Sequence, residues 1–116
     1  MPDRQRDRLG QIAHEITAAR RLAARHDRDS FAADEVAVAA MERFVERISE
    51  ASRRLDPALK ALEPVIPWAD IAGIGNVLRH DYDRIDLTIL WNIATRDLPV
   101  LEEAVKRLLA GLDSTA

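Results

Sequence analysis

The sequence predicts an all-α domain, arranged as an up-and-down bundle of four to five helices. Apolar residues recur at steps of three and four along most of the chain, which is typical of amphipathic helices. No segment shows the alternation of apolar and polar residues that would favour a strand. The chain has 116 residues, of which 47% are apolar and 32% charged, with 5 Pro and 4 Gly, so we expect a single domain over residues 1–116.

The first two predicted helices are the longest. The first begins near Asp3, and one face of it carries the apolar residues Leu9, Ile12, Ala13, Ile16, Ala19, Leu22 and Ala23. Residues 27–30 interrupt the pattern, and Ser30 or Asp29 is the expected N-cap of the next helix. The same period then runs from Val36 to Leu55.

The later helices are bounded by proline and aspartate. Asp56 and Pro57 begin a short helix through Leu62, and Pro64 ends it. A helix is expected from about Trp68 to His80, and another from Leu87 to Ala94, capped by Asp86. Asp97 with Pro99 opens a last helix whose apolar residues are Val100, Leu101, Val105, Leu108 and Leu109.

Composition excludes several classes of protein. The chain has no cysteine and no long apolar stretch, so we expect no disulfide, no thiolate metal site, no membrane span and a cytoplasmic location. The net charge is −3, although 15 of the 17 basic residues are arginine. The arginines at 4, 6, 8, 20, 21, 25 and 28 either form a phosphate-binding patch or lie on solvated helix faces among neighbouring aspartates.

The segment from Gly75 to Arg84 holds the residues best suited to chemistry. It combines an imidazole, a fixed cation, an amide and a phenol, which could act on a phosphate group. On a continuous helix, Asn76 and His80 share a face and Arg79 lies one turn from Gly75. The alternative is a helix end at which Arg79 and His80 offset the helix dipole.

Other motifs in this region predict no metal and no cofactor. Gly73 and Gly75 begin a dinucleotide-binding fingerprint, but Leu78 occupies its third glycine position and no strand precedes it. Asp81, Asp83 and Asp86 lack the glycine and the closing glutamate of a calcium loop.

Motifs along the chain resemble those of HepT-like toxins, which belong to the HEPN ribonuclease superfamily. The resemblance covers about residues 6 to 107 and is carried by Ile48-Ser49-Glu50-Ala51, Ile66-Pro67-Trp68, Ile71-Ala72-Gly73, Asn76 with His80-Asp81-Tyr82, Asp86-Leu87, Leu90-Trp91 and Asp97-Leu98-Pro99. It implies a homodimeric HEPN domain that cuts RNA without a metal ion. It further implies a minimal nucleotidyltransferase as antitoxin, which in some systems adds AMP to the motif tyrosine, here Tyr82.

The resemblance also implies roles for single residues. His80 would move protons to and from the RNA 2′-hydroxyl and the leaving oxygen. Asn76 and Tyr82 would position the RNA, which some relatives suggest is a transfer RNA. Glu50 either is a solvated charge or makes an inward hydrogen bond to the motif helix.

One motif position differs from the family pattern Arg-x-x-x-x-His-x-Tyr. Gly75 stands where the family has arginine, and glycine cannot stabilise charge on the phosphate. Two hypotheses follow. In the first, the chain is a ribonuclease in which Arg79 supplies the cation. In the second, it is a catalytically degenerate HEPN domain that binds a nucleotidyltransferase or RNA.

Overall fold

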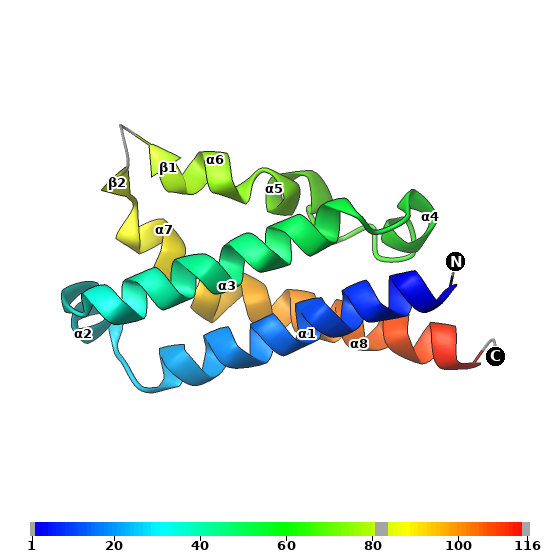
Figure 1. Ribbon diagram of the computed structural model, residues 1–116, viewed down its shortest axis with the longest axis horizontal. Coiled ribbons are helices and arrows are strands. Elements are labelled where there is room, and N and C mark those ends of the chain that lie inside the picture. The colour runs from blue at the N-terminus through cyan, green and yellow to red at the C-terminus, as the bar shows by residue number, and fades with distance from the viewer. Residues whose placement is uncertain (1, 81–83, 115–116) are drawn as a thin grey trace.

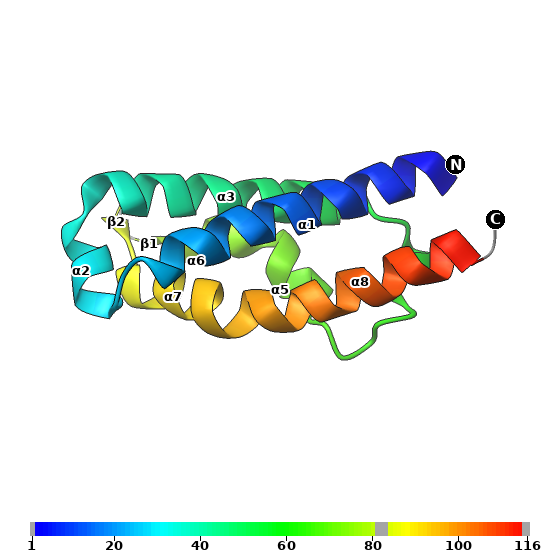
Figure 2. The same ribbon diagram turned by 90° about the horizontal axis from the view of Figure 1, so that it is seen from below.

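Three long helices lie side by side along the longest dimension of the molecule, which measures 46 Å (Figures 1 and 2). They are α1 (Pro2–Ala24), α3 (Glu35–Arg53) and α8 (Leu98–Ser114). This computed structural model describes residues 2–80 and 84–114. Helix α1 contacts both α3 and α8, and the N- and C-terminal ends lie at the same end of the bundle. The prediction of an all-α architecture is confirmed.

The apolar face predicted for the first helix forms the centre of the core. Leu9, Ile12, Ile16 and Ala19 are 0% exposed, and Met41 and Val45 of α3 are equally buried. Helix α8 adds Leu101, Ala104, Val105 and Leu108 to the same cluster. The three- and four-residue spacing therefore predicted most of the buried side chains correctly. Val36 and Val100, which it also placed on apolar faces, are 79% and 55% exposed, because each lies in the first turn of its helix.

The connection between the first two long helices contains an additional short helix. Asp27 caps α2 (Arg28–Ala33), accepting a hydrogen bond from the backbone N–H of Ser30 while the Ser30 hydroxyl receives one from the Asp27 N–H. Asp34 caps α3 and accepts from Val36 N and Ala37 N at 3.0 Å. The predicted caps Ser30 and Asp29 were therefore wrong, because Asp27 and Asp34 are the side chains that accept the unpaired N–H groups.

The loop after α3 contains a short helix, and a tryptophan side chain is hydrogen-bonded to its backbone. Helix α4 (Pro57–Lys60) begins at the predicted proline and ends slightly earlier than expected. The indole N–H of Trp68 donates to the backbone oxygens of Lys60 and Glu63, each at 3.1 Å. Trp68 thus acts as a structural anchor.

The predicted helix from Trp68 to His80 is interrupted. It consists of α5 (Trp68–Ala72) and α6 (Ile74–Leu78), followed by the two-residue strand β1 (Arg79–His80), which pairs antiparallel with β2 (Arg84–Ile85). Gly73 and Gly75 weaken a helix here, and the Ala72 carbonyl accepts hydrogen bonds from side chains of α3. Figure 1 shows α5, α6 and β1 running along α3 on the side away from α1.

The last two predicted helices are one continuous helical run. Asp86 caps α7 (Leu87–Asn92) as predicted, and a π-helical turn, η1 (Ile93–Asp97), leads directly into α8. The expected break at Asp97 is therefore wrong. Because Pro99 has no N–H and its ring would collide with the Thr95 carbonyl of a regular α-helix, the widened turn accommodates it without ending the helix.

Several arginines of α1 and α2 form contacts between elements. Arg6 pairs with Asp113 at 3.0 Å, Arg20 pairs with Glu102, and Arg28 donates to the Thr88 hydroxyl at 2.9 Å. These contacts favour structural roles for the three arginines over a phosphate-binding patch.

Within the described ranges, no helix combines the length and the apolar character needed to cross a bilayer.

Candidate nucleic-acid site

A polar hollow of about 550 Å³ lies between α3 and α6. Of the described residues that line it, all but Gly75 of α6 come from a single side of α3. Charged groups dominate this described lining, which comprises Arg43, Glu46, Arg47, Ser49, Glu50, Arg53 and Gly75. The hollow therefore borders the segment in which the sequence places the candidate catalytic residues.

The end of α5 is held to α3 through one carbonyl group. The Ala72 oxygen accepts from Ser49 Oγ at 3.1 Å and from Arg53 Nε and Nη2 at 2.9 and 2.8 Å. Ser49 is 3% exposed, so its hydroxyl is fixed within the protein. These hydrogen bonds fix the start of α6 relative to the charged side of α3.

Glu50 lies on the wall of the polar hollow and is half exposed. Its carboxylate pairs with Arg53, the last residue of α3, at 3.1 Å and with Arg54, the C-cap of α3, at 2.9 Å. Among the contacts of the described residues, its link to the α5–α6 segment runs through Arg53, which donates to Ala72. The structure thus shows an indirect link through a bridging arginine, and a direct bond from Glu50 to the motif helix stays a prediction.

The remaining arginines of the hollow differ in their contacts. Arg47 Nη1 lies 3.2 Å from a carboxylate oxygen of Glu15 on α1, and the Glu15 side chain is 5% exposed. Arg43 is exposed and makes no hydrogen bond or ion pair with another described residue. Arg43 therefore has its guanidinium available for an external anion.

The candidate residues of the motif are adjacent in the backbone, but not on one helix. Asn76 lies in α6, whereas Arg79 and His80 form β1. The helical relation expected between Asn76 and His80, and between Gly75 and Arg79, is therefore wrong. Side-chain positions of these three polar residues, and all of Tyr82, fall outside the described parts of the chain. Their roles stay predictions.

Gly75 leaves open space in the hollow. A Cβ atom at this position would meet no heavy atom within 4 Å, and the backbone does not adopt a positive φ. A Cβ atom is therefore accommodated at position 75 without backbone strain or steric clash. The glycine at this motif position is not required by packing.

A second cavity, of about 460 Å³, lies on the other side of the α5–α6 segment. Its walls are mostly aliphatic, with contributions from α3, α5, α6 and the α7–α8 run, and the residues include Val45, Ile48, Ile71, Ile74, Ile89, Ile93 and Leu101. Two carboxylates, Asp70 and Asp97, also line it. None of the described residues that line this cavity supplies a cation for a phosphate.

Histidines outside the motif have structural surroundings. His26 Nδ1 lies 3.0 Å from the Ser30 hydroxyl, and its ring contacts Phe31 edge-on. His14 is exposed on α1. In the portion of the chain that the structure describes, no three His, Cys, Asp or Glu side chains are grouped so as to hold a metal ion.

Sequence reasoning missed Arg43, Ser49 and Arg53 as site residues. The spacing of Glu50 and Arg53 on one helix could have indicated their ion pair. The approach of Ala72 to Arg53 joins residues 19 apart in sequence, so only the fold reveals it.

Comparison with known proteins identifies relatives over most of the chain. The family described as "Ribonuclease HepT-like" matches residues 12–108. "Putative RNase TTE0752" of Caldanaerobacter subterraneus subsp. tengcongensis is 32% identical over 81 residues, which cover 70% of this chain and 72% of the relative. "Probable ribonuclease HepT" of Thermococcus cleftensis is 32% identical over 80 residues, covering 69% and 73%. No solved structure matches the chain. With the family match spanning the long helices and the motif segment, the chain belongs to the HepT-like ribonuclease family of the HEPN superfamily.

Proposed function

We propose that this protein is a metal-independent endoribonuclease and the toxin of a toxin–antitoxin pair whose antitoxin is a minimal nucleotidyltransferase. The observation that carries the proposal is the family match over residues 12–108, which includes His80 and the α3 wall of the polar hollow. Relatives named as RNases support the same activity. The homodimer, the cytoplasmic location and AMP addition to Tyr82 are parts of this proposal.

The reaction needs few groups. A base removes the proton of the RNA 2′-hydroxyl, whose oxygen attacks the adjacent phosphorus, and an acid protonates the leaving 5′ oxygen. This gives a 2′,3′-cyclic phosphate and a free 5′-hydroxyl. In the proposal His80, contributed by both subunits, performs the two proton transfers, since the ordinary pKa of histidine lies near ~6.5. Arg79 stabilises the phosphate charge, and Asn76 and Tyr82 position the RNA.

Gly75 favours a second candidate, a catalytically degenerate domain that binds RNA or the nucleotidyltransferase without cutting. The position lacks the cation of the family motif, and no packing constraint explains the glycine. In that case the hollow serves binding only.

RNA cleavage in the presence of a chelator tests the two candidates. The purified protein, unmodified at Tyr82, is incubated with mixed cellular RNA, and new 2′,3′-cyclic phosphate ends are mapped alongside His80→Ala. We expect cleavage by the wild type and loss of cleavage in the variant, with DNA left intact. Cleavage that persists in folded His80→Ala would contradict the role of His80.

Gly75→Arg separates the candidates further. If the wild type is inactive and Gly75→Arg cuts RNA, the native site is degenerate only at this position. If both proteins are folded and neither cuts, the endoribonuclease proposal is wrong and the binding function stands.

A further inference from the structure

The polar hollow offers a cation that neither the sequence motif nor the family pattern assigns. It presents Arg43, Arg47 and Arg53 beside Gly75, at the position where the motif arginine is missing. Arg43 and Arg47 are one helical turn apart on α3, about 6 Å along its axis. Three guanidinium groups of α3 therefore line the hollow beside Gly75.

The three arginines are not equally available. Arg53 is bound to the Ala72 carbonyl and to Glu50, and Arg47 pairs with the buried Glu15 carboxylate. Arg43 has no such contact with another described residue and is exposed. Two carboxylates, Glu46 and Glu50, also line the hollow, and the charge of Glu50 is offset by Arg53 and Arg54.

We propose that the polar hollow binds a phosphate group of single-stranded RNA, and that Arg43 is the positioning cation that replaces the arginine missing at Gly75. This inference rests on the proposed function, because it takes RNA as the ligand. A guanidinium group suits this task, since its planar set of N–H donors matches two phosphate oxygens and it stays charged at every physiological pH. Arg47 contributes its remaining donors from one turn along the helix.

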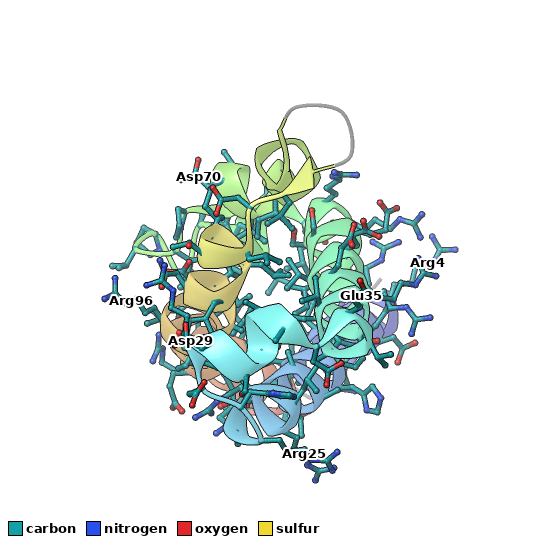
Figure 3. All side chains as sticks on the ribbon, turned by 90° about the vertical axis from the view of Figure 1, so that its left-hand side faces the viewer. Arg4, Arg25, Asp29, Glu35, Asp70 and Arg96 are labelled. Carbon is teal, nitrogen blue, oxygen red and sulfur yellow. The ribbon has the colours of Figure 1, made fainter. Side chains whose placement is uncertain are left out.

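Binding of uncleavable RNA tests the inference independently of catalysis. The probe is a fluorescein-labelled, 2′-O-methylated single-stranded RNA, and its affinity for the full-length protein is measured by anisotropy over a range of salt concentrations. We expect Arg43→Ala to weaken binding about tenfold and to reduce the salt slope by about 0.7, the value for one lost contact to a single strand. Arg96→Ala is the matched control, because Arg96 on η1 is exposed and is not among the described residues that line the hollow. Figure 3 shows Arg96 projecting from the side of the molecule opposite Arg4.

A rescue variant gives the inference a second readout. Because a side chain at position 75 enters open space, Gly75→Arg can place a guanidinium in the same hollow. We expect Gly75→Arg to restore RNA binding in an Arg43→Ala background by about fivefold to tenfold, and to add less than about twofold to the wild type. Equal gains in RNA affinity in both backgrounds would mean that positions 43 and 75 contact different phosphates. That result would contradict the proposal that Arg43 replaces the motif arginine.

The outcomes separate this inference from the proposed function. Arg43-dependent RNA binding without any cleavage contradicts the nuclease and leaves the inference intact. Cleavage by the wild type, with equal RNA affinity in Arg43→Ala and Arg96→Ala, contradicts the inference and leaves the nuclease intact. Absence of RNA binding by the folded wild type overturns the inference directly.

Discussion

The three-helix bundle and the segment from residue 56 to 85 are stabilised in different ways. Helices α1, α3 and α8 bury aliphatic side chains along their whole length. Of the described side chains between residues 56 and 85, only Ile66 and Leu78 are buried, while Trp68, Ile71 and Ile74 are partly buried against the core. Polar contacts also fix that segment, through the Ala72 carbonyl, the Trp68 indole and the ion pair of Glu63 with Arg107. The bundle thus provides stability, whereas the segment can change its chemistry at positions such as Gly75 without disturbing the core.

Core truncation in the bundle should have the largest effect. Ile16 is 0% exposed in α1, and Ile16→Ala should lower the free energy of unfolding by about 3 kcal/mol, because it removes buried methyl groups and leaves a cavity. Urea denaturation measures this change. Val36→Ala is the control, since Val36 on α3 is 79% exposed and its truncation should cost no more than about 0.5 kcal/mol. Equal effects at both positions would show that α1 does not pack in the core.

Breaking the ion pair between α1 and α3 should have the second largest effect on the free energy of unfolding. Arg47→Ala leaves the Glu15 carboxylate, 5% exposed, without its partner, and should cost about 2 kcal/mol. Replacing Glu15 with glutamine as well should recover part of that loss, because a neutral amide is cheaper to bury than an unpaired charge. Denaturant titration of both variants checks the order. A double variant less stable than Arg47→Ala alone would argue against the charge explanation.

Removing the Arg53 hydrogen bonds to the Ala72 carbonyl should affect the local structure of α5 and α6 more than the global stability of the protein. Arg53→Ala removes two hydrogen bonds to the Ala72 carbonyl and should lower the free energy of unfolding by only about 1 kcal/mol. Amide hydrogen exchange in α5 and α6 should accelerate, while exchange in α1 stays the same. Arg54→Ala, which keeps these hydrogen bonds and removes only a surface ion pair, is the control. If exchange rose equally in α1, the segment would be coupled to the whole bundle.

The smallest effect concerns pH. Arg107 donates to both carboxylate oxygens of Glu63, at 2.7 Å from Nη2 and 3.1 Å from Nε, and this lowers the pKa of Glu63 from its usual 4.5. The contribution is therefore present above the unfolded pKa and is lost as pH falls through the lower folded value. We expect Arg107→Gln to flatten the loss of thermal stability below pH 4.5 slightly, whereas Lys106→Gln should not. Identical pH profiles for the two variants would show that the pairing of Glu63 with Arg107 does not contribute to the pH dependence of stability.

The helical period was the most informative feature of the sequence. Burying one stripe of an amphipathic helix requires apolar residues at steps of three and four, so Leu9, Ile12 and Ile16 could be assigned to the core from spacing alone. The helix N-caps could be predicted only in part from the sequence. Asp86 was predicted correctly, but Asp27 and Asp34 were missed because several neighbouring residues can cap and only the folded path selects among them.

The sequence by itself determined the all-α class, the buried faces and the family motif around His80, since these depend on local spacing and residue type. The tertiary structure alone decided that the motif helix ends at Leu78, that the Ala72 carbonyl is bound by Ser49 and Arg53, and that Arg43 faces the space beside Gly75. The last two of these facts join residues far apart in sequence, Ala72 with Ser49 and Arg53, and Gly75 with Arg43. Such contacts arise from the packing of α5 and α6 against α3, which no local pattern specifies.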